Sequence, residues 1–147
     1  MCVKLCPSLK HGTKVRHGKA KHIVLCSGKV YYDLAVERDA SKAWDIEIIR
    51  IEQLYPFPKK SLKEIFSKTP GASIVWCQEE PKNMGGWTFV RDYIEDIMAE
   101  TGMQQKRLAY AGRVAAASPA TGTLSRHNRE QNDLVAAALD IPIKLKI

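Results

Sequence analysis

The sequence of 147 residues contains no C-x-x-C pair, only one histidine beyond residue 22 and no long apolar run. A membrane-spanning helix needs about 20 consecutive apolar residues, so the sequence predicts no such helix. The basic residues near the start are followed by neither an apolar h-region nor a small-residue cleavage site, and we therefore expect no secretory signal. These features favour a soluble intracellular protein with one domain, since domains of roughly 100–150 residues are the commonest.

The four cysteines indicate buried thiols rather than disulfides or a metal site. Cys26 and Cys77 lie inside apolar runs, where a free cysteine packs as a small hydrophobic residue. Cys2 and Cys6, even together with the nearby histidines, do not match the ligand spacing of a standard zinc site. This cysteine usage is typical of a reducing compartment.

The net charge of +7 is concentrated at the start of the chain. Residues 1–22 contain six lysine or arginine residues and no acid, which leaves a net charge of +1 for the other 125 residues. A fold that binds nucleic acid carries a basic stripe or a basic platform with stacking aromatic residues, and neither pattern is present. We therefore predict a basic tail over residues 1–21, disordered or unrelated to the domain, a folded domain over residues 22–147, and no nucleic-acid partner.

Short apolar runs alternate with segments of helical periodicity. This alternation predicts an α/β fold, a three-layer sandwich around a mainly parallel sheet of about five strands. The last residues, Ile141–Ile147, are either an edge strand or a tail. The predicted strands are His22–Ser27, Asp45–Leu54, Ser73–Gln78 and Arg107–Ala111, and the predicted helices are Lys29–Ala43, Lys59–Lys68, Trp87–Thr101 and Leu124–Leu139.

Polar residues follow the predicted strands, where the carboxyl edge of a parallel sheet gathers functional groups. Glu79 and Glu80 are adjacent, so their side chains point to opposite sides of an extended chain and cannot face one bond. No motif places a nucleophile near His127, and a catalytic triad therefore has no support. Basic residues at helix starts could instead contact an anionic effector or a partner. The candidate effector or interface residues are Lys29, Lys59, Lys60, Glu79, Glu80 and Arg113.

Four strings occur in a fixed order along the chain: CSGKVYYDL (Cys26–Leu34), RIEQLYPFP (Arg50–Pro58), WCQEEPKNMGGW (Trp76–Trp87) and YAGRVAAASPATG (Tyr110–Gly122). Together they resemble the C-terminal domain of the decarboxylating component of 2-oxoglutarate dehydrogenase. The final helix, with His127, Gln131 and Leu134, continues the resemblance, which covers about residues 22–140.

The resemblance implies a transketolase-type third domain that supports a homodimer. In that family the full enzyme is an oxidoreductase of the tricarboxylic acid cycle, and it decarboxylates 2-oxoglutarate with thiamine diphosphate and Mg²⁺. It then transfers the succinyl group to a lipoyl-bearing succinyltransferase component. The cofactor lies between the two preceding domains, and the G-D-G…N-N motif of its metal site is missing here. We therefore expect no catalytic, cofactor-binding or metal-binding residue and no activity from the isolated chain.

Two further expectations come from the resemblance. The chain would act in the cytoplasm if it is bacterial and in the mitochondrial matrix if it is eukaryotic. Some relatives use this domain in an allosteric site, so a regulatory module that binds acetyl-CoA or AMP is the alternative function.

Overall fold

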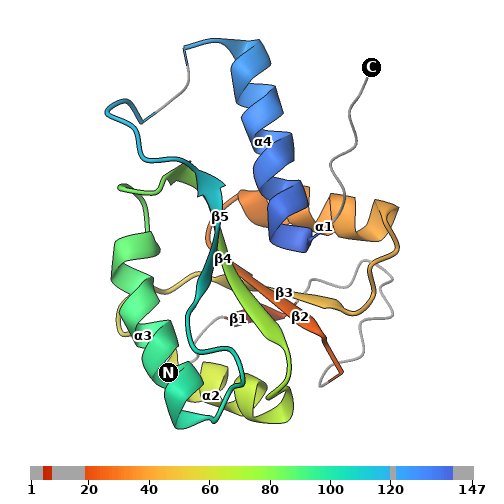
Figure 1. The fold of residues 1–147 in the computed structure, drawn as a ribbon, viewed down its shortest axis with the longest axis vertical. Helices are drawn as coiled ribbons and strands as arrows, with labels where there is room; N and C mark the ends of the chain where they lie inside the picture. The colour runs from red at the N-terminus through yellow and green to blue at the C-terminus, as the bar shows by residue number, and fades with distance from the viewer. Residues whose placement is uncertain (1–4, 8–18, 120–121, 141–147) are drawn as a thin grey trace.

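The fold is built on a twisted sheet of five strands (Figure 1). A computed structural model describes residues 5–7, 19–119 and 122–140 of the chain. Four parallel strands lie in the order β3-β2-β4-β5, and β1 pairs antiparallel with the outer edge of β3. The strands are β1 (Leu5–Pro7), β2 (His22–Cys26), β3 (Ile46–Ile51), β4 (Ser73–Pro81) and β5 (Ala109–Arg113).

The predicted α/β class and mainly parallel sheet are confirmed, but the fifth strand has an unexpected source. It is formed by Leu5–Pro7, within the segment predicted to be a basic tail, so the tail prediction needs correction at these three residues. A proline is tolerated here because an edge strand leaves one side of its backbone unpaired. The other possible edge strand, Ile141–Ile147, lies outside the described residues, and the division of the chain at residue 22 otherwise stays a prediction.

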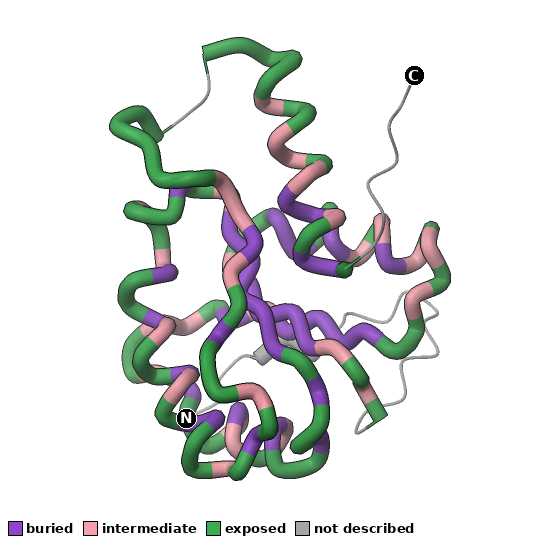
Figure 2. The backbone as a smooth tube through the Cα atoms, in the orientation of Figure 1, coloured by how far each residue is buried: buried purple, intermediate pink, exposed green. Residues whose placement is uncertain are grey.

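Two pairs of helices cover the two faces of the sheet, as a three-layer sandwich requires. Both pairs pack on buried residues of the sheet, and the strands are largely purple, the colour of buried residues, in the backbone tube of Figure 2. Within the described ranges, no helix is long and apolar enough to cross a membrane. Helices α1 (Val30–Ala40) and α4 (Leu124–Leu139) pack on one face, and α2 (Lys59–Lys68) and α3 (Trp87–Glu100) pack on the other.

The central strands are apolar on both faces because helices cover both faces. In β2, Ile23 and Leu25 join the cluster under α2 and α3, whereas Val24 and Cys26 join the cluster under α1 and α4. Cys26 lies in register with Cys77 of β4, and both thiols are free and fully buried, as predicted. Burial raises the pKa of Cys26 to about 12 and also raises the pKa of Cys77, so both remain protonated thiols.

Substitutions on the buried side of α3 should lower the free energy of unfolding much more than substitutions on its exposed side. Ile94→Ala removes a fully buried side chain and should lower the free energy of unfolding by about 2–5 kcal/mol. Thr88→Ala, at an exposed position of the same helix, should change it by less than about 0.5 kcal/mol. Urea unfolding of both variants checks the assignment, and equal effects would contradict it.

Candidate functional site

The carboxyl edge of the sheet has one topological switch point. The chain passes from β3 on one side of β2 to β4 on the other, so the loops after β2 and β4 leave toward opposite faces. Open α/β sheets bind ligands in the crevice at such a point. Here the two flanking segments are Ser27–Lys29 and Gln78–Pro81.

A polar network surrounds Glu79 at this point. Lys29 Nζ lies 2.6 Å from Glu79 Oε1, and Gln131 Nε2 of α4 donates to the same oxygen at 3.0 Å. Gln131 Nε2 also lies 2.8 Å from Asp33 Oδ2 of α1. The pKa of Lys29 is raised, mainly by its hydrogen bond to Glu79. The Lys29 side chain nevertheless remains 72% exposed. The network therefore joins the end of β4 to both helices on that face.

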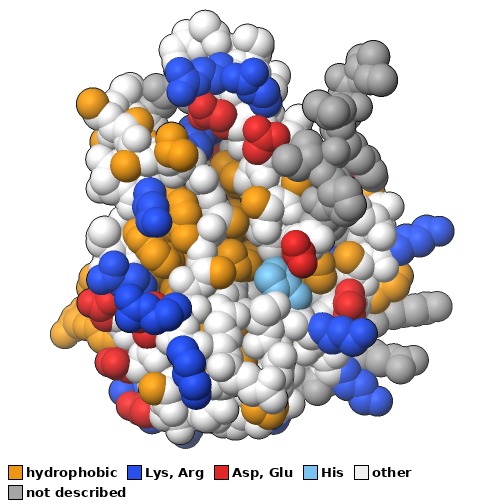
Figure 3. Space-filling model, viewed as in Figure 1, with side chains coloured by type: hydrophobic (Ala, Val, Ile, Leu, Met, Phe, Trp, Pro, Cys, Tyr) orange, Lys and Arg blue, Asp and Glu red, His pale blue; other side chains and the backbone are white. Residues whose placement is uncertain are grey.

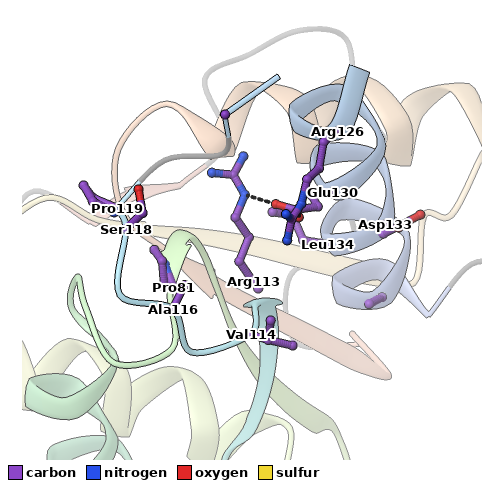
Figure 4. A pocket seen from close by; sticks show the side chains of 13 residues that line it. Pro81, Arg113, Val114, Ala116, Ser118, Pro119, Arg126, Glu130, Asp133 and Leu134 are labelled. Atoms are coloured by element: carbon purple, nitrogen blue, oxygen red, sulfur yellow. Dashed lines mark hydrogen bonds and ion pairs between the residues drawn. The ribbon is translucent and has the colours of Figure 1, made fainter. Parts of the chain in front are cut away.

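Arg113, the last residue of β5, forms a second link to α4 (Figure 4). Its side chain is only 9% exposed, and its Nη2 donates to His127 Nδ1 at 3.0 Å. Its Nε lies 3.2 Å from Glu130 Oε2, although the angle is too poor for a hydrogen bond. Glu130 also pairs with Arg126 at 2.7 Å. His127 thus contacts Arg113 from the first turn of α4.

A cavity of about 680 Å³ lies between α4 and the segment that follows β5 (Figure 4). Its walls are partly apolar, with Val114, Pro119 and Leu134 among them. Its charged lining residues balance, because Arg113 and Arg126 are matched by Glu130 and Asp133. A ligand in this cavity would therefore be bound mainly by apolar contacts, because the lining residues carry no net positive charge.

The outer wall of the cavity is held by one asparagine. Asn83 Nδ2 donates to the carbonyl oxygen of Ala116 at 3.0 Å, and the Ala116 amide donates to Asn83 Oδ1 at 3.1 Å. The Lys82 amide donates to the carbonyl oxygen of Arg113 at 3.1 Å. These bonds attach the segment after β5 to the segment after β4.

The structure brings together only part of the candidate set. Lys29, Glu79 and Arg113 lie near the same carboxyl edge. Lys59 instead pairs at 2.8 Å with Glu100 at the end of α3, on the opposite face of the sheet, and this hydrogen bond raises the pKa of Lys59. Lys60 is exposed on α2, in the same layer.

Glu80 lies apart from the network around Glu79, as the alternation along an extended strand predicts. Its carboxylate is beside Gly85, whereas Glu79 contacts Lys29 and Gln131. Among the residues that the structure describes, no three His, Cys, Asp or Glu side chains form a group that could hold a metal ion.

Gln78 is the residue whose importance the sequence did not reveal. It is buried, and its Oε1 accepts hydrogen bonds from Trp76 Nε1 and from the Trp87 amide, both at 2.9 Å. Its Nε2 donates to the carbonyl oxygens of Met84 at 2.7 Å and Pro81 at 3.2 Å. One side chain thus fixes the end of β4, the turn over residues 81–86 and the start of α3. The only available signal was its position within the string WCQEEPKNMGGW.

Two glycines, Gly85 and Gly112, allow the backbone to pass close to Gln78 and its neighbours. Gly85 has a φ of +66°, and a Cβ there would lie 3.0 Å from Gln78 Nε2. A Cβ on Gly112 would lie 2.5 Å from the Tyr110 hydroxyl and 2.8 Å from the carbonyl oxygen of Gln78. Both positions therefore require glycine for steric reasons.

Comparisons with known proteins agree with the class that this architecture defines. A solved structure described as "Split gene transketolase, inactive beta4 tetramer" has a similar fold, with a TM-score of 0.56 and 15% identity over 95% of this chain and 46% of that chain. At this identity the likeness shows the fold alone: the chain has an α/β fold similar to part of that transketolase.

The particular family follows from the sequence. The profile of the family "2-oxoglutarate dehydrogenase C-terminal" matches residues 5–139, and the chain belongs to that family. The match begins earlier than the resemblance noted from residue 22, and it includes β1. The "2-oxoglutarate dehydrogenase E1 component" proteins of Brucella anthropi, Brucella ovis and Brucella melitensis biotype 2 are each 52% identical over 112 residues. These residues are 76% of this chain and only 11% of each relative.

Replacement of the Gln78 side chain should be costly. Gln78→Met keeps the approximate size but leaves the buried Trp76 Nε1, the Trp87 amide and the Met84 carbonyl without their partner. We expect a loss of about 2–4 kcal/mol in the free energy of unfolding, measured with urea. Glu80→Gln, at an exposed neighbouring position, is the control, and a Gln78→Met effect as small as that of the control would exclude the role assigned to the amide.

Tyr110 should make stability fall at high pH. Burial raises the pKa of its hydroxyl to about 12, above the value of about 10 expected in the unfolded chain. The unfolded state therefore loses its proton first, so the stability from Tyr110 is complete below pH 10 and lost as pH rises toward 12. Tyrosinate absorbance of wild-type and Tyr110→Phe proteins checks this, and the variant should lack the transition near pH 12.

Proposed function

We propose that this chain acts as the dimer-supporting C-terminal domain of a 2-oxoglutarate dehydrogenase and that it has no complete active site of its own. The proposal rests on the family to which residues 5–139 belong and on how the polar residues of the carboxyl edge are used. Because the chain spans about a tenth of the length of its curated relatives, the reaction belongs to a much longer protein.

The polar residues at the switch point support a structural role because they bind one another. Glu79 is engaged by Lys29 and Gln131, and the Arg113 guanidinium lies between His127 and Glu130. A reaction centre needs a reactive group that is directed toward a substrate. At this edge the groups instead attach α1 and α4 to the ends of β4 and β5, which makes the edge a rigid surface.

Thiamine diphosphate and Mg²⁺ do not fit the described residues of this chain. A diphosphate held by Mg²⁺ needs oxygen ligands for the ion. Among the described residues no three His, Cys, Asp or Glu side chains group together to hold an ion, and Asp33, Glu79 and Glu130 are engaged by amide or basic groups. We therefore assign the binding of this cofactor to the preceding domains of the enzyme, and its chemistry, the stabilisation of a carbanion at the decarboxylated carbon, to those domains as well.

The partners follow from the same proposal. They are the remaining domains of the dehydrogenase, the second subunit of a homodimer and the lipoyl-bearing succinyltransferase of the complex. Because the matched relatives are bacterial, we propose the cytoplasm rather than the mitochondrial matrix.

The alternative function, a module that binds an anionic effector, receives less support. The candidate lysines do not converge, since Lys59 lies on the opposite face from Arg113. Lys29 is neutralised by Glu79, and the charges that line the cavity cancel. An anion that binds Lys29 would have to displace the Glu79 carboxylate, and the loss of that ion pair reduces the net free energy of binding.

Two measurements test the proposed function. Calorimetry of the 147-residue chain with thiamine diphosphate and Mg²⁺ should show no binding below millimolar concentration, because the described part of the chain holds no group of side chains that could bind the ion. A chimera in which residues 22–140 replace the C-terminal domain of the Brucella anthropi relative should remain dimeric and decarboxylate 2-oxoglutarate. Tight cofactor binding to the isolated chain, or a chimera that fails to assemble, would refute the proposal.

A further inference from the structure

Four aromatic side chains lie on α3 and on the segment after β3, and three of them, Phe57, Phe89 and Tyr93, are in ring contact. This aromatic patch consists of Tyr55 and Phe57 from the segment after β3 and Phe89 and Tyr93 from α3. The rings of Phe57 and Tyr93 are stacked with centroids 5.0 Å apart, and those of Phe89 and Tyr93 are 5.2 Å apart. Figure 3 shows hydrophobic side chains gathered on the α3 and β5 side of the molecule.

The aromatic patch is not needed to complete the core of this domain. Helix α3 already buries Trp87, Val90 and Ile94 against the sheet. Tyr55, Phe89 and Tyr93 are 80%, 40% and 38% exposed. Within the described ranges, the hydroxyls of Tyr55 and Tyr93 have no hydrogen-bond partner in the protein, so both can donate to another surface.

The position of the patch is nevertheless fixed by the core. Phe57 is partly buried and packs against the cluster under α2 and α3, and Tyr93 stacks on Phe57. The rings are thus held in place before any partner arrives, which lowers the entropic cost of binding.

The exposed apolar residues of α1 differ from this patch. Tyr32 packs edge-on against Tyr31 and lies 5.4 Å below the Arg50 guanidinium, so its ring has partners within the domain. Val36 is a single aliphatic side chain on the same helix. Isolated apolar residues of this kind are ordinary on protein surfaces, whereas clustered aromatic rings are enriched at the centres of protein interfaces.

The chemistry of the surroundings indicates another protein as the partner. Asp96 is exposed on α3 one turn from Tyr93, and the exposed Asp92 is paired with Arg91, so this stretch of the helix carries no net positive charge to attract a nucleic-acid backbone. The relatives of the chain carry about nine-tenths of their length outside the matched region, and the matched family is named as the C-terminal part. The remaining part of such an enzyme is joined to this domain in one polypeptide, so it is the partner with the highest effective concentration at the patch.

We infer that the aromatic patch is the surface on which the preceding domains of the dehydrogenase dock. The inference rests on the proposed function and deepens it, because it names the face that makes the contact. The partner surface is apolar at its centre and presents carbonyl or carboxylate oxygens to the two tyrosine hydroxyls.

The chimera with residues 22–140 provides the test, with Tyr93→Ser and Tyr55→Ser as patch variants and Val36→Ser as the matched exposed control. Docking protects the linker that precedes the domain, so each patch variant should raise the rate of linker cleavage by a protease about tenfold, as expected when one central contact is removed. The control should leave the rate unchanged. Thermal melting of the intact 147-residue chain with each substitution shows whether the domain itself still folds, and Tyr55, in a loop, gives a variant that does not depend on α3.

Cleavage rates of both patch variants equal to that of the control would overturn the inference while leaving the proposed function intact. A patch variant that converts a dimer of the isolated chain to a monomer, without effect in the chimera, would also overturn it, since the patch would then bind a second copy. An unsubstituted chimera that does not assemble would refute the proposed function and the docking together.

Discussion

The hydrogen bonds of one buried amide determine how the second half of the domain is assembled. The Gln78 side chain accepts from an indole and from the first amide of α3, and it donates to carbonyl oxygens of the turn before α3. A buried amide without these partners would be strongly unfavourable, so the turn must adopt the one path that satisfies it. This path fixes both where α3 begins and where the chain leaves β4.

The position of α4 depends in turn on that exit. Because β4 continues to Pro81, Glu79 lies beyond the neighbouring strand β2 and can contact Gln131 in the middle of α4. Arg113 holds the first turn of the same helix through His127. At the opposite edge of the sheet, His22 Nε2 lies 2.7 Å from the carbonyl oxygen of Ala138, near the end of α4. Helix α4, the longest helix of the described chain, is therefore attached to the sheet at its first turn, at its middle and near its end.

The periodic features of the fold could be predicted from the sequence. Continuous apolar runs marked three of the four parallel strands, and the helical stripes placed α2 and α4 at the bounds that the structure gives them. Such patterns are predictable because many residues contribute to each of them. Strand β1 could not be found in this way, since Leu5–Pro7 is three residues long and contains a proline, and its pairing depends on the free edge of β3.

The candidate site was predictable only in part, for a similar reason. The carboxyl edge collects the ends of parallel strands, so Lys29, Glu79 and Arg113 could be expected near one another. Lys59 could not be placed, because the segment after β3 carries the chain to the other face before α2 begins. Gln78 was missed because a single polar residue in a strand has no periodic signature, and its partners lie in a turn whose path the amide itself determines.

The paired hydrogen bonds of Asn83 with Ala116 have a consequence for how this fold can diversify. The Asn83 amide donates through Nδ2 and accepts through Oδ1, so it pairs with the backbone of Ala116, beyond the end of β5, as a peptide group of a neighbouring strand would. The wall of the neighbouring cavity is thus held by this side chain together with the backbone bond between Lys82 and Arg113. Substitutions near residue 83 can reshape the cavity without shifting the register of the core.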